Sequence, residues 1–145
     1  MTQPFTKLVT VHWKDCDVAG IVYYPRYFDM INVVTEDWFK EALGTSYADL
    51  MRTEHLGFPT VRIDCEFCLP CQYGENIEFS LTVAELGRSS LSLDFIGQIA
   101  GKTCLRANHT LVLMSKDTFS AVSIPPDLRA RIEPYLKTAA AHDGR

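Results

Sequence analysis

Apolar and polar residues alternate along several stretches of the chain, which is the pattern of β-strands with one buried face. A first strand is predicted from Leu8 to Lys14, where Val9, Val11 and Trp13 alternate with polar residues. Similar alternation predicts four more strands in the second half of the chain, at 60–69, 77–83, 91–99 and 103–114. Because no helical pattern separates these four strands, we expect them to pair as an antiparallel meander.

A different periodicity runs between Pro25 and Gly44. Apolar residues recur there every three or four positions, which predicts one long helix with a broad buried face: Tyr27, Phe28, Met30, Ile31, Val34, Trp38, Phe39 and Ala42. Pro25 suits the first helical position, since its missing N–H costs nothing there, and we expect the helix to end at Gly44. The predicted class is α+β, with this helix filling the concave face of the sheet.

The length of 145 residues suits one domain, which we predict to span residues 1–137. Residues 124–126 begin a short terminal helix that Pro134 is expected to end, because proline breaks a helix interior. Residues 138–145 are predicted to form a disordered tail.

Composition and charge narrow the classes of partner. Hydrophobic residues make up 47% of the chain and charged residues 22%, the balance of a folded protein. The formal net charge is −4 and basic residues are scattered, which argues against nucleic acid or an anionic membrane as the main partner. The amino terminus lacks a secretion signal, and no apolar stretch is long enough to cross a bilayer, so we expect a cytoplasmic protein.

Five cysteines without a secretion signal indicate reduced thiols instead of a disulfide framework. Cys65, Cys68 and Cys71 form a C-x-x-C-x-x-C run that suggests a metal site. A structural zinc site needs four ligands, however, and no second pair of cysteines or suitably spaced histidine follows. We favour buried or turn cysteines and expect no metal and no other cofactor.

The segment from Asp15 to Tyr27, DCDVAGIVYYPRY, carries the strongest chemical signal. It combines an aspartate, a small-residue turn, an apolar pair, an aromatic pair and a proline at the start of the predicted helix. In this combination the segment resembles the signature of the 4-hydroxybenzoyl-CoA thioesterase family, within the hotdog superfamily. The resemblance implies a hotdog fold, in which a five-stranded antiparallel sheet wraps around one long helix.

The same resemblance implies roles for individual residues in the hydrolysis of an acyl-CoA thioester. Asp17 would act as nucleophile or general base, the backbone N–H of Tyr24 would contact the oxyanion, and Gly20 and Tyr23 would contact the substrate. The chemistry is reasonable, since an ionised carboxylate can attack or activate water and a helix N-terminus offers free N–H groups. The alternative is that Asp17 only satisfies N–H groups of its own loop, although Asp15 is the more natural candidate for that role.

Coenzyme A carries phosphates, and the resembling enzymes place a basic, serine-containing contact at the turn that holds Arg88, Ser89 and Ser90 here. This turn has one arginine where several basic residues are expected, so an exposed turn arginine without a function is an equal alternative. His109 shares a face with Leu105, Ala107, Leu111 and Leu113, which favours a structural histidine in the core.

The predicted activity is therefore the hydrolysis of an acyl-CoA ester, with an aromatic acyl group favoured. A thioesterase for short or medium aliphatic acyl groups, of the type linked to the Tol–Pal operon, is the nearest alternative, but such enzymes usually have a histidine where Tyr24 stands. A hotdog dehydratase would need a histidine base, which the segment lacks. A non-catalytic acyl-CoA binder is the remaining alternative. The resemblance also implies a homodimer or homotetramer with its sites at the dimer interface.

Overall fold

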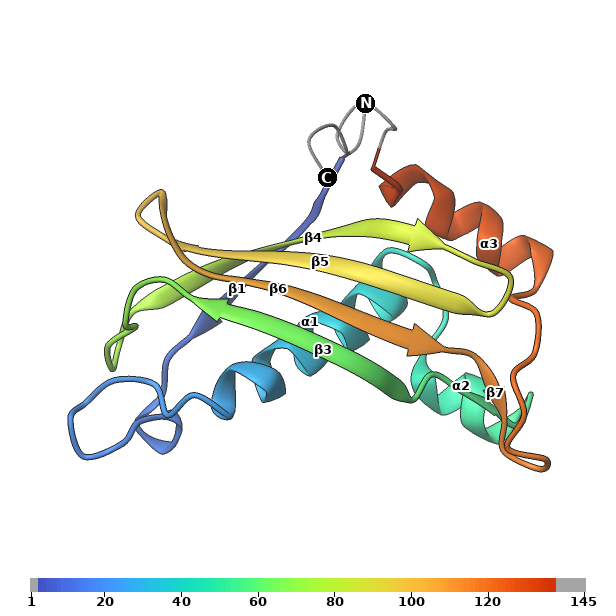
Figure 1. Ribbon diagram of the computed structural model, residues 1–145, viewed down its shortest axis with the longest axis horizontal. Helices are drawn as coiled ribbons and strands as arrows, with labels where there is room; N and C mark the ends of the chain where they lie inside the picture. The colour runs from blue at the N-terminus through green and yellow to red at the C-terminus, as the bar shows by residue number, and fades with distance from the viewer. Residues whose placement is uncertain (1–2, 138–145) are drawn as a thin grey trace.

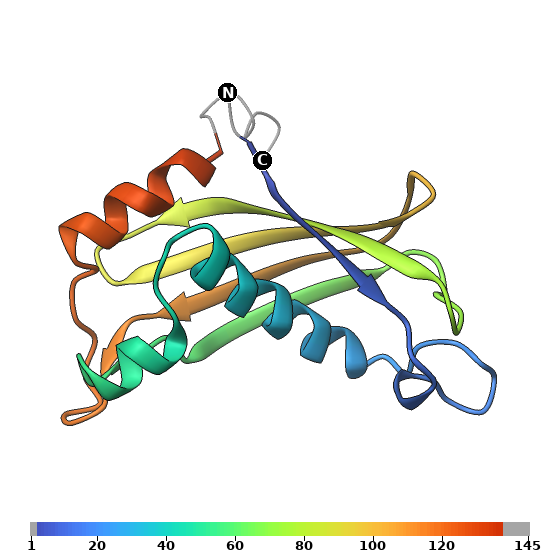
Figure 2. The same cartoon turned by 180° about the vertical axis from the view of Figure 1, so that it is seen from behind.

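A five-stranded antiparallel sheet curls around one long helix in the computed structural model, which describes residues 3–137 (Figures 1 and 2). The elements are β1 (Phe5–Thr10), η1 (Trp13–Asp15), α1 (Arg26–Glu41), α2 (Tyr47–Arg52), β2 (Leu56–Gly57), β3 (Thr60–Phe67), β4 (Asn76–Leu86), β5 (Ser90–Ile99), β6 (Lys102–Val112), β7 (Met114–Ser115), α3 (Pro126–Ile132) and η2 (Glu133–Tyr135). The predicted α+β class and the hotdog arrangement are confirmed.

The strand order is β1-β4-β5-β6-β3, which corrects the expected meander. Strands β4, β5 and β6 do follow one another, but β3 pairs with β6 at the opposite edge from β1. The link between β3 and β4 is too long for a tight hairpin, so it does not force these two strands to be neighbours. The N–H groups of Cys68 and Leu69 in this link both donate to the Cys104 carbonyl at the start of β6.

The first strand ends earlier than predicted, at Thr10. Trp13 and Asp15 instead bound a single 3-10 turn, in which the Asp15 carboxylate accepts the His12 N–H at 2.9 Å. Val9 packs against the core and Val11 is fully buried, as the alternation predicts, whereas Trp13 is 65% exposed. The hydrogen bond from the His12 backbone to the Asp15 side chain therefore replaces the strand pattern over the last four predicted residues, 11–14.

Helix α1 lies across the concave face of the sheet and buries the predicted apolar side, as Figure 2 shows from the helix side. It begins at Arg26, with Pro25 as its N-cap, and ends at Glu41, three residues before Gly44. The N–H groups of Leu43 and Thr45 then close the end of the helix on the carbonyls of Trp38 and Phe39. Gly44 has a φ of +70°, the left-handed conformation that glycine adopts readily in such a turn.

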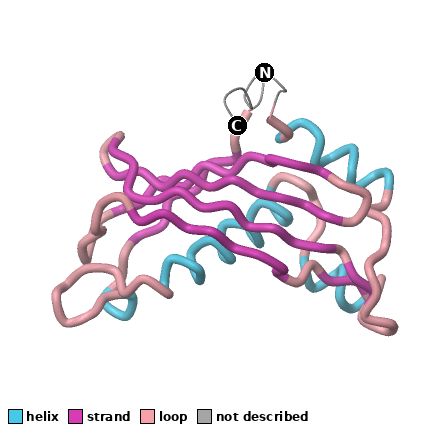
Figure 3. The backbone as a smooth tube through the Cα atoms, viewed as in Figure 1, coloured by secondary structure: helices cyan, strands magenta, loops and turns pink. Residues whose placement is uncertain are grey.

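The remaining segments gather at the two ends of the sheet (Figure 3). The short elements α2, β2 and β7 were not predicted. Helix α3 begins at Pro126 as expected, but Pro134 lies within the following turn η2, at an early position where its missing N–H is not needed. Residues 138–145, predicted as a disordered tail, lie outside the described residues. Within residues 3–137, no helix has the length and apolar character needed to cross a membrane.

Candidate active site

The loop between β1 and α1 folds into a small hairpin that positions Asp17. Cys16 pairs with Val22, and the Asp17 N–H donates to the Ile21 carbonyl at 2.9 Å. Gly20 closes the hairpin with a φ of +79°, and its N–H donates to the Asp17 carbonyl at 3.0 Å. A side chain there would be strained in this conformation, which explains the glycine.

The link between β3 and β4 holds this hairpin in place. The Val22 N–H donates to the Cys71 carbonyl at 2.9 Å, and the Tyr73 N–H donates to the Gly20 carbonyl at 3.0 Å. The position of Asp17 thus depends on a segment about 50 residues later in the chain.

The Asp17 carboxylate is half-buried and has one oxygen without a partner. Its Oδ1 accepts the Ala19 N–H at 2.9 Å, which is the local turn that aspartate often forms. Among the residues that the structure describes, Oδ2 accepts no hydrogen bond and forms no ion pair. The local bond orients the carboxylate and leaves the second oxygen available to a substrate or a water molecule.

Asp15, two residues earlier, has the structural role that its position suggested. It is buried, and its carboxylate accepts the His12 N–H at 2.9 Å and pairs with the Lys14 ammonium at 2.8 Å. Burial works to raise the pKa of this carboxyl, but the bonds from Lys14 and His12 outweigh it and hold the pKa below its usual value. Asp15 therefore stabilises the loop, and Asp17 is the aspartate with free acceptor capacity.

The Tyr24 N–H lies at the amino end of α1 and donates to no acceptor within residues 3–137. Its neighbours are all engaged: the Tyr23 N–H donates to the Asp15 carbonyl, and the Arg26 N–H to the Tyr23 carbonyl. Pro25 has no N–H. Tyr24 therefore contributes a free backbone donor where the helix dipole is positive, which is the arrangement that stabilises an oxyanion.

An apolar groove of about 510 Å³ opens beside the Tyr24 ring. Three segments line it: the hairpin, the first turn of α1, and the end of β3 with the link that follows, namely Ile21, Val22, Tyr24, Tyr27, Phe67, Cys68, Leu69 and Pro70. Tyr27, which the periodicity places on the buried face of the helix, is buried in the core and also lines the groove. Trp38 is fully buried and belongs to the core, whereas Tyr23 is 50% exposed and does not line the groove.

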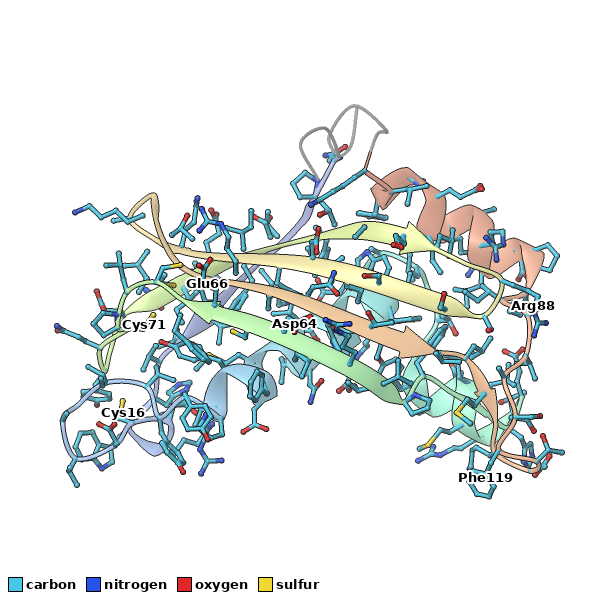
Figure 4. All side chains as sticks on the ribbon, in the orientation of Figure 1. Cys16, Asp64, Glu66, Cys71, Arg88 and Phe119 are labelled. Carbon is cyan, nitrogen blue, oxygen red and sulfur yellow. The ribbon has the colours of Figure 1, made fainter. Side chains whose placement is uncertain are left out.

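Arg88, Ser89 and Ser90 lie at the opposite end of the sheet from Asp17, as the labels of Cys16 and Arg88 show in Figure 4. Strand β4 has 11 residues, and strands rise about 3.3 Å per residue, so the two ends are roughly 35 Å apart. The exposed Arg88 guanidinium donates to the Ser123 hydroxyl at 2.5 Å. One copy of the chain therefore does not bring the predicted phosphate contact to Asp17.

A second arginine, which the sequence did not reveal, supports this turn. The Arg129 guanidinium on α3 donates to the Gly87 carbonyl at 2.6 Å and to the Arg88 carbonyl at 3.3 Å. Periodicity shows only that Arg129 lies on a short helix, and its proximity to the turn depends on the tertiary fold.

The three cysteines of the C-x-x-C-x-x-C run differ in how deeply they are buried. Cys65 on β3 is half-buried, Cys68 is exposed and Cys71 is buried. Within residues 3–137, no three cysteine, histidine or acidic side chains are grouped so that they could hold a metal ion. The Cys71 thiol is instead buried beside the Cys104 thiol, whose proximity holds the pKa of Cys71 below its usual value. Burial raises the pKa of the neighbouring Tyr27 hydroxyl, which stays neutral.

His109 is 1% exposed, as the core interpretation predicts. Its Nε2 lies 2.6 Å from the Thr60 hydroxyl, while its Nδ1 is buried without a partner among the described residues. Burial lowers the pKa of this imidazole.

Comparison with known proteins gives a consistent result. The model of the thioesterase-like superfamily matches residues 11–132. A curated 1,4-dihydroxy-2-naphthoyl-CoA hydrolase from Crocosphaera subtropica is 25% identical over 122 residues, which are 84% of this chain and 83% of the relative.

Two solved structures have the same fold. A thioesterase superfamily protein from Jannaschia sp. CCS1 has a TM-score of 0.86 at 27% identity, with 93% of this chain and 94% of that chain covered. A 1,4-dihydroxy-2-naphthoyl-CoA thioesterase from Synechocystis has a TM-score of 0.83 at 20% identity, with 90% and 96% covered.

Proposed function

The chain belongs to the thioesterase-like superfamily and is an acyl-CoA thioesterase, and we propose that its substrate is an aromatic acyl ester of coenzyme A. The segment DCDVAGIVYYPRY supports an acyl group like 4-hydroxybenzoyl, whereas the curated relative from Crocosphaera subtropica is named for a hydroxylated naphthoyl ester. The proposal adopts what these two acyl groups share, a hydroxylated aromatic ring next to the thioester carbonyl.

One observation carries the proposed mechanism. The loop before α1 holds an aspartate with a free carboxylate oxygen, and a few residues later a free backbone N–H lies beside an apolar groove. A thioesterase needs these three features: a nucleophile or base, a donor for the oxyanion, and a site for the acyl group.

In this mechanism the acyl group lies in the groove with its carbonyl oxygen near the Tyr24 N–H. The Asp17 Oδ2 either attacks the carbonyl carbon directly or removes a proton from a water molecule that attacks it. The negative charge that develops on the carbonyl oxygen is stabilised by the Tyr24 N–H and the helix dipole. The C–S bond then breaks and the thiolate takes up a proton. On the direct route the acyl group is left on Asp17 as a mixed anhydride, which water then hydrolyses to the acid and the free carboxylate; on the other route the attacking water has already formed the acid. The products on either route are the acid and coenzyme A.

A homodimer completes the site in this proposal. Arg88 lies roughly 35 Å along the sheet from Asp17, so the Arg88 that grips the coenzyme A phosphates has to come from another copy of the chain. Strand β3 has an open edge with an exposed apolar residue, Val61, and is suited to pair with a second copy.

A panel of acyl-CoA esters tests the proposal. The purified protein is given benzoyl, 4-hydroxybenzoyl, 1,4-dihydroxy-2-naphthoyl, hexanoyl and decanoyl esters, and free thiol is measured. We expect kcat/KM to be highest for one of the aromatic esters. Higher values for both aliphatic esters would instead support the aliphatic thioesterase, and binding without thiol release would support a non-catalytic binder.

A further inference from the structure

Phe67 has an unusual position for the last residue of an edge strand. It lies on the same face of β3 as Ile63 and Cys65, as its pairing with Leu105 shows, and that face packs toward α1. Helix α1 begins at Arg26, however, and the face extends beyond this first turn. Phe67 is therefore 48% exposed, although its alternation would place it in the core.

The Phe67 ring faces two rings from the start of α1. Its centroid lies 5.6 Å from that of Tyr27, with an angle of 35° between the planes, and 6.1 Å from that of Tyr24, with an angle of 74°. These separations fall in the range of favourable ring contacts. The three rings form one side of the groove, next to the Tyr24 backbone N–H.

No charged side chain lines the groove among the residues that the structure describes. Glu66, the residue before Phe67, forms an ion pair with Arg106 at 3.7 Å. Glu66 alternates with Phe67 and so lies on the other face of β3. An anionic acyl group would lose its hydration in the groove and find no counter-charge there.

We propose that Phe67 sets the acyl specificity of the enzyme: its ring selects a neutral, planar aromatic acyl group and places it against Tyr27, with the thioester carbonyl toward the Tyr24 N–H. The proposal rests on the proposed thioesterase function. It adds that specificity depends on a side chain of β3, outside the loop that carries Asp17. Phe67 positions the acyl group and takes no part in the chemical step.

The test compares kcat/KM for benzoyl-CoA and hexanoyl-CoA, two neutral esters of similar size, in wild type, F67L and F67Y. Leucine keeps most of the apolar volume and removes the ring, whereas tyrosine keeps the ring. We expect the ratio of benzoyl to hexanoyl activity to fall roughly 2- to 10-fold in F67L, the range that a ring contact supports, and to stay within twofold in F67Y.

Phe119 supplies the matched control. It is 78% exposed and lies at the other end of the sheet (Figure 4), so F119L should leave the ratio unchanged. A third ester, 4-carboxybenzoyl-CoA, tests the requirement for a neutral ring, and we expect at least a tenfold lower kcat/KM than for benzoyl-CoA in wild type. Equal rates for these two esters would contradict that requirement.

Different results would contradict the role of Phe67 and the thioesterase function. If wild type releases thiol but F67L keeps the wild-type ratio, or loses both activities equally, Phe67 does not set the acyl specificity and only this inference is wrong. If wild type releases thiol from none of the esters, the proposed function is itself wrong. Thermal unfolding of F67L, compared with wild type, shows whether that variant folds, and F67Y is read in the same way.

Discussion

At the scale of single residues, Asp15 and Asp17 have different environments although they are two positions apart. Asp15 is buried and bonded to His12 and Lys14, and Asp17 is half-buried with one free oxygen. The sequence motif identified Asp17, and loop chemistry suggested the structural role of Asp15. The ring of Phe67 was missed, because alternation assigned it to the buried face of a strand and gave no sign that α1 leaves that end uncovered.

Because His109 is buried, we expect the free energy of unfolding to depend on pH. Burial lowers the pKa of its imidazole, so the unfolded chain takes up a proton near pH 6.5 while the folded protein does not. Between pH 6.5 and the lower pKa of the folded state, the unfolded state binds more protons, and the free energy of unfolding falls as the pH falls. The loss can reach about 1.4 kcal/mol per pH unit, and it is absent above pH 6.5.

Urea unfolding at pH 7.5, 6.5 and 5.5 measures this effect. H109Q, which cannot take up a proton, should flatten the decline below pH 6.5. The exposed His55 is the control, and H55N should keep the wild-type slope, since asparagine tolerates the positive φ of that residue. A slope that H109Q leaves unchanged would assign the decline to other groups.

At the scale of secondary structure, the sequence predicted those elements and turns that local periodicity determines. The apolar face of α1 and the hairpins between β4, β5 and β6 follow from alternation and from turn residues such as Gly101, with its φ of +79°. The position of β3 beside β6 could not be predicted in this way. The eight-residue link after β3 allows it to pair with either β4 or β6, and long-range contacts decide between them. The short strands β2 and β7 have only two residues each, too few for a pattern to appear.

We expect a substitution of Arg88, in the turn between β4 and β5, to weaken substrate binding without slowing the chemical step. If Arg88 pairs with a coenzyme A phosphate, R88A should raise KM several-fold and change kcat little, because the contact is the same in the ground state and the transition state. An exposed phosphate contact contributes on the order of 1 kcal/mol, and the effect should shrink as salt rises. Steady-state thiol release at two salt concentrations measures both quantities.

A truncated substrate gives the control for this prediction. With an acyl-pantetheine ester, which lacks the nucleotide, wild type and R88A should be nearly equal. Equal impairment of R88A on both substrates, or none on the full ester, would make Arg88 a turn residue only.

At the scale of the whole molecule, the open edges of the sheet bear on assembly. One edge is β1 and the other is β3, and both carry exposed apolar residues, Leu8 and Val61. The sequence implied a dimer through its resemblance to the hotdog enzymes. It could not show that Asp17 and Arg88 lie at opposite ends of one copy, since that distance follows from the strand order and the length of β4.

Lysine substitutions, placed on one edge strand at a time, test which edge of the sheet forms the dimer interface. V61K should convert the dimer to a monomer of 16.4 kDa and lower thiol release, because a charged side chain disrupts strand pairing at an edge. L8K, on the opposite edge, should keep the wild-type mass and activity. Sedimentation equilibrium gives the mass. A wild type that is already monomeric and active, or a V61K variant that remains dimeric, would contradict pairing through β3.

The central claim is that the Asp17 carboxylate carries out the hydrolysis. Asparagine at this position keeps the shape and the oxygen that accepts the Ala19 N–H, and removes the ionised group that attacks or activates water. D15N serves as the matched control, because it removes the charge of the neighbouring carboxylate that only stabilises the loop.

The measurement is the rate of thiol release from the best aromatic ester by D17N and D15N, together with the thermal unfolding of both. We predict that D17N unfolds like wild type and loses at least a hundredfold in kcat, and that D15N unfolds at a lower temperature and retains most of its activity. A D17N protein that is folded and releases thiol at close to the wild-type rate would contradict the account.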